Sequence, residues 1–300
     1  MAVLNSVTVY LGSSGHARPV FYKQARALGQ SLAKKGVKVV FGGMNAGAMR
    51  SLSHGVIEAG GEVTGVIPTK IRDSERVSRE VRELIDVETM WQRKRLMFDL
   101  GEALIVMPGG YGTLDEALEA IHWKVLGLHQ KPIYFINVEG FFDPVFEFID
   151  RAIERGHMPG DTASAFTRLS DFSALDLNKE ISSDATQVVA EGFPHFEDEI
   201  FVPTRTPIII DAPDMAQSYK LMTALVTRQL GAHKRPIGVL NKNGVFDPLI
   251  DWVRRARDER FITRKCPSLM TVRKTEAGLM AALERKEEVV IDLHRDKWGS

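Results

Sequence analysis

A glycine-rich turn followed by a glutamate is the segment of this chain that most constrains its chemistry. Residues 108–116 read Pro-Gly-Gly-Tyr-Gly-Thr-Leu-Asp-Glu, between an apolar, strand-like run and a run with helical spacing of apolar residues. Gly109, Gly110 and Gly112 leave backbone N–H groups uncovered at the positive end of a helix, which makes a preformed anion site. A phosphate cradle with the single carboxylate of Glu116 beside it suggests chemistry on a phosphorylated sugar.

The spacing leaves two interpretations of Glu116 open. A carboxylate near C1′ of a ribosyl group stabilises the positive charge that develops as the C1′–N bond breaks, and it can orient or deprotonate water. Thr113 and Glu116 also have the spacing of a capping box, in which each side chain bonds the backbone N–H of the other residue. Spacing alone favours capping. Asp115 is the lesser alternative carboxylate, and Thr113 is expected to add a hydroxyl to the phosphate cradle.

Two earlier glycine-rich turns also follow strand-like runs. The first is Gly-Ser-Ser-Gly at 12–15, and the second is Gly-Gly-Met-Asn-Ala-Gly at 42–47. Ligands of parallel α/β sheets bind at the carboxyl ends of strands, so we expect the three turns to face one crevice. The residues predicted to line it are Ser13, Gly43, Asn45 and Gly47. Ordinary turn chemistry for Ser13 and close helix–strand packing for Gly47 remain alternatives.

A basic pair precedes the third turn in a predicted helix. Arg93 and Lys94 share a side of this helix with Met90 and other apolar residues at i+3/i+4 spacing. At least one of the two charges therefore leaves the solvent-facing side and needs a partner. A substrate phosphate or Glu116 would serve, and the planar fork of Arg93 suits phosphate or ribose hydroxyls. Met90, Arg93 and Lys94 are accordingly candidate site residues.

Strand-like and helix-like runs alternate along the first half of the chain. Strands are expected at 7–11, 37–41, 63–67, 103–107 and 132–137, and helices at about 19–35, 47–59, 89–99, 113–126 and 142–155. The polar stretch 70–83 is predicted to be a loop. Repeated strand–helix units with short glycine-rich links predict an α/β fold, a Rossmann-like doubly wound parallel sheet.

The second half contains a partial copy of the first. At a constant offset of 104 residues, 12 of the 33 pairs between 126–158 and 230–262 are identical. The same offset puts Pro213 on Gly109 and Lys220 on Glu116, so the copy lacks the anion turn and the carboxylate. We predict a Rossmann-like nucleotide-binding catalytic domain at 1–190 and a smaller, degenerate α/β domain at 195–300. The acidic segment 191–199 is a plausible connection.

Composition excludes several classes of protein. Lys plus Arg and Asp plus Glu both number 39, which leaves no electrostatic signal for nucleic acid or for a membrane surface. A single Cys266, no leader-like N-terminus and no apolar run near 20 residues indicate a cytoplasmic protein that does not bind membranes. No His, Asp, Glu or Cys set has metal-ligand spacing, so we expect neither a metal nor a cofactor.

Residues 7–180 resemble the LONELY GUY (LOG) family, often labelled "putative lysine decarboxylase". The second turn is similar to the family's GGxxxGxM motif, residues 60–68 match its next strand, and residues 90–97 match its MxxRKxxM helix. Residues 108–116 match PGGxGTxxE in full. The arginine–lysine helix some twenty residues before the last motif makes the resemblance specific. Trp91 departs from the pattern, because family members often have His there.

The resemblance implies hydrolysis of the N-glycosidic bond of a nucleoside 5′-monophosphate to a free base and ribose 5-phosphate. The implied substrate is a purine nucleotide, AMP or a cytokinin riboside 5′-monophosphate, with Glu116 and Arg93 as catalytic residues. The region 70–90 and Trp91 are expected to form the base pocket. Family members form dimers, so a homodimer is expected, and the half-copy is hypothesised to supplement or mimic the dimer interface. A non-hydrolytic nucleotide sensor or carrier, or a hydrolase with another base specificity, remains the alternative.

Overall fold

The predicted doubly wound fold is confirmed in the computed structural model, which describes residues 4–69, 77, 80–175 and 193–292. Its larger sheet has seven parallel strands in the order β4-β3-β2-β1-β5-β6-β7. These strands are β1 (Ser6–Tyr10), β2 (Lys38–Phe41), β3 (Val63–Pro68), β4 (Glu83–Val87), β5 (Ala103–Val106), β6 (Ile133–Ile136) and β7 (Thr167–Leu169). The strand order reverses between β1 and β5, which is where such sheets bind their ligands.

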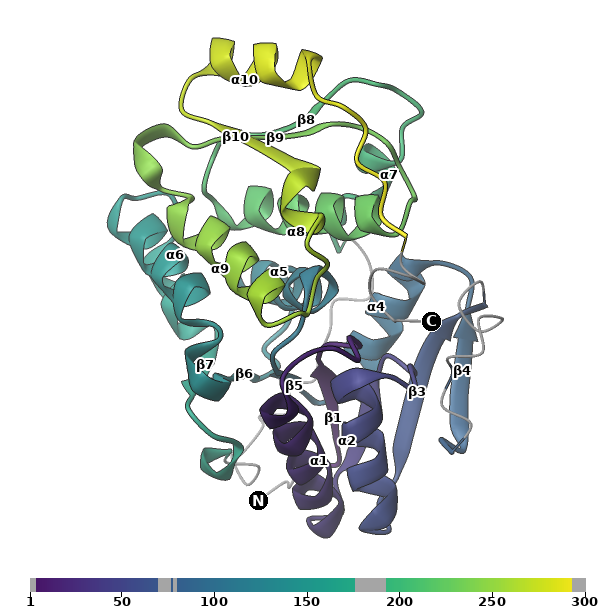
Figure 1. Ribbon diagram of the computed structural model, residues 1–300. Coiled ribbons are helices and arrows are strands. Elements are labelled where there is room, and N and C mark those ends of the chain that lie inside the picture. The colour runs from purple at the N-terminus through teal and green to yellow at the C-terminus, as the bar shows by residue number, and fades with distance from the viewer. Residues whose placement is uncertain (1–3, 70–76, 78–79, 176–192, 293–300) are drawn as a thin grey trace.

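Five longer helices connect these strands. They are α1 (Pro19–Lys34), α2 (Gly47–Glu58), α4 (Met90–Leu100), α5 (Tyr111–Val125) and α6 (Asp143–Glu154). Helices α1 and α2 pack against each other, whereas α4 packs over β1, β2 and β3. Figure 1 shows α1 and α2 at the foot of the molecule and α5 and α6 nearer its middle.

Strands β4 and β7 lie outside the predicted set of strands. They are the two edge strands of the sheet, and their side chains are mostly exposed or half-buried. Edge strands therefore lack the continuous apolar run that marked the central strands. The predicted loop 70–83 ends where β4 begins, at Glu83, and most of it lies outside the described residues.

A second sheet of three parallel strands, in the order β10-β9-β8, forms a smaller unit. Its elements are β8 (Ile208–Ile210), α8 (Met215–Gln229), β9 (Ile237–Leu240), α9 (Asp247–Asp258), β10 (Met270–Arg273) and α10 (Glu276–Glu284). The predicted boundary between 190 and 195 falls partly outside the described residues, so the domain limits stay a prediction.

The smaller unit repeats the second half of the larger one element by element. Helices α8 and α9 begin and end 104 residues after α5 and α6, and β9 does the same relative to β6. Turn geometry repeats too, since Glu139 (φ 51°) and Asn243 (φ 56°) both adopt the left-handed conformation. His129 and His233 each bond a backbone carbonyl of the preceding helix, at 2.8 and 3.0 Å. Because the same bond recurs in the copy that lacks the anion turn, it indicates a structural role for both histidines.

The two units share a hydrophobic core. Buried side chains from both sheets form one continuous cluster, which includes Trp123 from α5 and Trp252 from α9. Figure 1 shows the smaller unit lying across α5 and α6. Within the described residues, no helix is both long and apolar enough to span a membrane.

Candidate active site

The three glycine-rich turns come together at the carboxyl ends of β1, β2 and β5. Gly12 in the first turn contacts both of the others. Its N–H donates to Pro108 O in the third turn at 3.1 Å, and its carbonyl accepts from Ala48 N, just after the second turn, at 3.1 Å. The turns are so close that a Cβ on Gly47 would lie 2.2 Å from Ser14 O. The structure thus brings together the turns that the sequence placed at neighbouring strand ends.

The third turn presents the start of α5 to this junction. Helix α5 begins at Tyr111, two residues before the predicted start, and its N-cap is Gly110 in an extended conformation (φ −96°, ψ −155°). Tyr111, Gly112 and Thr113 are therefore the first three helical residues, whose N–H groups have no partner within the helix. The capping-box interpretation of Thr113 and Glu116 is wrong, because Thr113 lies inside the helix and the N-cap makes no side-chain bond.

Glu116 instead faces Arg93 across the interior of the site. Arg93 Nη1 lies 3.4 Å from Glu116 Oε1, and both residues are nearly excluded from solvent, with exposed fractions of 8% and 5%. Arg93 also donates from Nε to Val66 O at 3.1 Å and from Nη2 to Gly42 O at 3.2 Å. One guanidinium therefore ties together the end of β3, the second turn and the carboxylate of α5.

The electrostatic environment of Glu116 brings its titration close to neutral pH. Burial raises the pKa of Glu116 to about 7, with Arg93 acting in the opposite direction and Asp115 adding to the rise. A carboxyl group with such a pKa exchanges its proton easily at physiological pH. The site therefore combines three glycine turns that suit an anion with one carboxyl group, Glu116, that can transfer a proton or stabilise positive charge.

Lys94 points into a different, fully buried cluster. Its ammonium group lies 3.1 Å from Asp115, 3.0 Å from Glu119 and 3.0 Å from Glu197 of the short helix α7 (Glu197–Ile200). Burial by itself lowers the pKa of Lys94, but Asp115 and Glu119 raise it well above its ordinary value. Our expectation that Lys94 binds substrate is therefore revised, because its contacts are to carboxylates and to the hydroxyl of Tyr219.

Sequence reasoning missed the other members of this cluster. Thr223 donates to Asp115 at 2.5 Å, and the Tyr219 hydroxyl donates to Glu119. Burial raises the pKa of Glu119 to about 8 and also raises that of Asp115. The i,i+4 spacing of Asp115 and Glu119 could have placed these two acids on one helix face. Tyr219 and Thr223 come from the half-copy, and no sequence pattern around them predicts contact with Asp115 or Glu119.

Of the remaining predicted residues, Ser13, Gly43, Asn45 and Gly47 belong to the turns that meet here. Gly43 (φ 72°) and Gly47 (φ 56°) both adopt the left-handed conformation that favours glycine. Asn45 is half-buried, and its Oδ1 has no hydrogen-bond partner among the described residues. Such a group calls for a partner, and a substrate hydroxyl or water would supply one. Ser13 and Met90 are half-buried in the first turn and at the start of α4.

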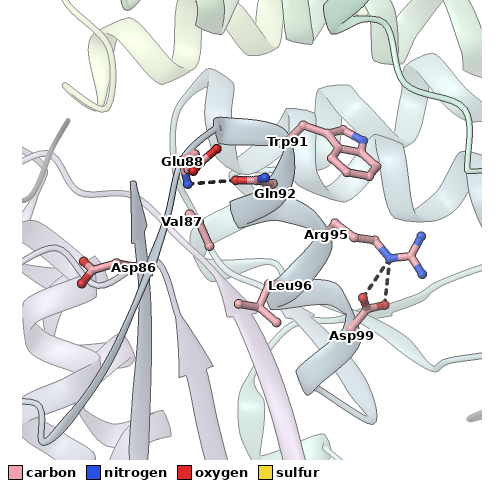
Figure 2. Close-up of a pocket in the computed structure, with 8 residues that line it drawn as sticks. All are labelled: Asp86, Val87, Glu88, Trp91, Gln92, Arg95, Leu96 and Asp99. Carbon is pink, nitrogen blue, oxygen red and sulfur yellow. Dashed lines mark hydrogen bonds and ion pairs between the residues drawn. The ribbon is translucent and has the colours of Figure 1, made fainter. Parts of the chain in front are cut away.

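Trp91, which is predicted to form the base pocket with the region 70–90, lines a surface cavity, and the base pocket stays a prediction. This surface cavity of about 440 Å³ lies between β4 and α4. Its lining residues, which include Trp91, Arg95 and Asp99, are drawn in Figure 2. Residues two apart on a helix do not share a face, so Trp91 lies away from Arg93, and its ring packs 5.0 Å from that of His195. Within the region 70–90, Val77 bridges Met44 of the second turn, whereas 70–76 and 78–79 lie outside the described residues.

Comparison with known proteins identifies relatives of this chain. The family model described as "Possible lysine decarboxylase" matches residues 49–175 and 220–283, and therefore both copies. The rice (Oryza sativa subsp. japonica) protein named "Cytokinin riboside 5'-monophosphate phosphoribohydrolase LOG" is 40% identical over 155 residues, which are 52% of this chain and 64% of the rice protein. The Arabidopsis thaliana protein of the same name, LOG2, is 38% identical over 150 residues, covering 50% of this chain and 70% of the relative.

Solved structures of similar proteins cover about half of the chain. The Moco carrier protein from Chlamydomonas reinhardtii matches 56% of this chain and 90% of its own at 21% identity and a TM-score of 0.44. The molybdenum cofactor binding protein from Rippkaea orientalis matches 43% of this chain and 74% of its own at 28% identity and a TM-score of 0.38.

Proposed function

The chain belongs to the LONELY GUY (LOG) family, and from this premise we propose that it hydrolyses the N-glycosidic bond of a nucleoside 5′-monophosphate. The products are a free base and ribose 5-phosphate. Relatives of which this chain covers 64% and 70% carry the name of such a phosphoribohydrolase. The chemistry of the proposal rests on the residues that the fold brings together at the three turns.

The observation that carries the proposal is the buried Arg93–Glu116 pair beneath those turns. Breaking the C1′–N bond builds positive charge on the ribose, and a carboxylate excluded from solvent stabilises that charge more strongly than one in water. Glu116 supplies this carboxylate and orients or deprotonates the attacking water. Arg93 holds Glu116 in place and donates to the phosphate or to ribose hydroxyls.

The phosphate is assigned to the glycine turns. The N–H groups at the start of α5 and the positive end of its dipole favour an anion there. Gly109, Gly110, Gly112 and Thr113 provide the cradle, and Ser13, Gly43, Asn45 and Gly47 line the same junction. The proposed substrates are purine nucleotides, either a cytokinin riboside 5′-monophosphate, which the names of the relatives mention, or AMP. The proposed compartment is the cytoplasm.

The description of the family mentions lysine decarboxylation, and the two lysines that are buried in the described part of the chain do not favour that reaction. Lys94 is surrounded by three carboxylates. Burial lowers the pKa of Lys131 to about 8, but its ammonium group donates to the carbonyls of Phe98 and Gly101 at 2.6 and 2.7 Å. Both ammonium groups are therefore already engaged in holding the fold together.

The experiment that tests the proposal is chromatography of free base after incubation with nucleoside 5′-monophosphates, the matching nucleosides, and lysine. We expect base release from a monophosphate but not from its nucleoside, and loss of release in Glu116→Gln. Retained nucleotide binding without release from any monophosphate would overturn the proposal in favour of a non-hydrolytic carrier. Release from pyrimidine nucleotides alone would keep the reaction and change the base.

A further inference from the structure

The smaller unit docks on the larger one with each helix against its own counterpart. Helix α8, the copy of α5, packs against α5, and α9, the copy of α6, packs against α6. Figure 1 shows α8 running above α5, and α9 beside α6. Packing of like on like is the arrangement that two identical subunits adopt around a two-fold axis.

Side-chain contacts across α5 and α8 are reciprocal in the way that a two-fold axis requires. Tyr219 and Thr223 lie 104 residues after Asp115 and Glu119, so each pair occupies equivalent positions. Asp115 bonds Thr223, and Glu119 bonds Tyr219. Position i of one copy thus contacts position j of the other in both directions, which defines an isologous interface.

Helices α6 and α9 also contact each other's preceding turns, although not at equivalent positions of the repeat. Arg155, just after α6, donates to Asn243 O at 3.2 Å in the turn before α9. Arg255 in α9 donates to Gly140 O in the turn before α6. These two turns, Val138–Gly140 and Lys242–Gly244, are equivalent in the repeat. The contacts therefore cross the junction in both directions at a second place.

The half-copy also forms part of the wall of the candidate site. A Cβ on Gly12 would lie 2.6 Å from the Phe261 ring, and one on Gly110 would lie 2.9 Å from Ile262 Cγ2. Ser14 Oγ donates to Arg260 O at 2.6 Å. The segment after α9 therefore packs directly against the first and third turns, which hold the proposed phosphate site.

We propose that the C-terminal unit is a built-in second copy, which takes the place of a partner subunit on α5 and α6 and completes the active site of the larger unit. Phe261 and Ile262 support the glycine turns, and Tyr219 and Thr223 are positioning residues for α5, the helix that carries Glu116. This face is filled within one chain, so the proposal replaces our expectation of a homodimer. The part that concerns catalysis rests on the proposed function.

The first test is the molar mass of the full chain in solution, measured by light scattering over a range of concentrations. We expect a single chain of 33.5 kDa. A stable dimer would overturn the replacement of a partner subunit by the half-copy. This measurement needs no activity, so it decides the structural part of the proposal even if no nucleotide is hydrolysed.

The second test compares Thr223→Val with Thr227→Val in the full chain. Both threonines are buried on α8, but Thr227 bonds only backbone carbonyls of its own helix. We expect Thr223→Val to lower kcat/KM roughly tenfold, the equivalent of one buried hydrogen bond, and Thr227→Val to leave it unchanged. Equal values in the two variants would overturn the positioning role.

The pH profile separates positioning from a general loss of stability. The charged groups that face Glu116 are Arg93 and Lys94 from α4 and Asp115 from α5, and the neutral phenol of Tyr10 from β1 is a further titratable neighbour. The Thr223 bond lowers the pKa of Asp115, and the charge on Asp115 raises that of Glu116. Without the bond, Asp115 holds its proton more often, so the limb of the profile that belongs to Glu116 should move to lower pH. An unmoved limb would contradict the proposal.

Discussion

Arg93 lies 3.4 Å from Glu116 and joins α4 to α5 directly beneath the point where the three glycine turns meet. This separation is longer than the 2.7–2.9 Å of a strong charge-assisted bond. The carboxylate is therefore held in position without being fully neutralised. Such a group can respond to positive charge that develops on a substrate, which is the property the proposed reaction needs.

Replacing Glu116 with Gln tests its role with little change of shape. The amide keeps an oxygen toward Arg93 but can neither carry negative charge nor accept a proton. We expect base release to fall by about 10²- to 10⁴-fold, while the melting temperature stays within a few degrees of that of the wild type. The matched control is Glu154→Gln, at an exposed position at the end of α6. Wild-type rates in Glu116→Gln would exclude it from the chemistry.

Replacing Arg93 with Lys tests the guanidinium fork. Lysine retains the charge but cannot reach Val66 O, Gly42 O and Glu116 together. We expect the free energy of unfolding to fall by about 1–3 kcal/mol, because buried carbonyls lose their donor, and kcat/KM to fall more than tenfold. The control is Arg95→Lys, whose i,i+4 pair with Asp99 is worth only about 0.3–0.5 kcal/mol. Equal losses in the two variants would contradict the special role of Arg93.

The pKa of Glu116 predicts the pH dependence of the reaction. Glu116 acts as a carboxylate in the proposed mechanism, and its pKa is about 7, so kcat/KM should rise with pH and level off above neutrality. The substrate phosphate has its own pKa of about 6. Its titration therefore adds a limb to the pH profile of kcat/KM in the wild type and in every variant. A limb that is present in the wild-type pH profile and absent from that of the residual activity of Glu116→Gln therefore belongs to Glu116. Activity that falls through pH 7 would mean that its protonated form is the active one.

Glycine-to-alanine changes within the turns distinguish glycines that the packing of the turns requires from glycines that leave room for a ligand. A Cβ on Gly109 would lie 2.1 Å from Thr113 Oγ1 and 2.9 Å from Gly12 N, whereas one on Gly112 meets only Val226, at 3.6 Å. We expect Gly109→Ala to lower both the melting temperature and activity. Gly112→Ala should fold normally, because its Cβ meets only Val226 of α8, at ordinary van der Waals distance. A raised KM in this variant would report close approach of the proposed phosphate to residue 112, and an unchanged KM would place the phosphate elsewhere. Gly15→Ala meets nothing within 4 Å and is the control.

The carboxyl group of Glu119 predicts how stability changes with pH. Its pKa is raised from 4.5 to about 8 by burial, so the folded state retains a proton that the unfolded chain loses. Its stabilising contribution is full below pH 4.5 and is lost as the pH rises through 8. Glutamine does not ionise, so Glu119→Gln should not lose stability in this way. The difference between the melting temperatures of the variant and the wild type should therefore increase between pH 5 and 8. A constant difference across that range would contradict this protonation state.

Much of the fold followed from local patterns. Central strands such as β1 and β5 are buried along all or nearly all of their length and therefore appeared as apolar runs. The glycine turns after them marked the strand ends where ligands bind. The edge strands β4 and β7 were not predicted, because their side chains are exposed or half-buried and form no continuous apolar run. The role of Glu116 could not be settled locally, since a capping box and a catalytic carboxylate share the spacing of Thr113 and Glu116.

By itself the sequence determined the alternating fold, the three turns, the half-copy and the residues Arg93 and Glu116, because each has a short-range signature in residue type and spacing. Tertiary structure alone decided which acids meet which bases. It paired Arg93 with Glu116, turned Lys94 toward Asp115 and Glu119, and laid Thr223 of the half-copy on Asp115, a contact across 108 residues. Such contacts depend on how helices pack on each other and on the sheet. That packing depends on residues that are far apart in the sequence, so no single segment predicts it.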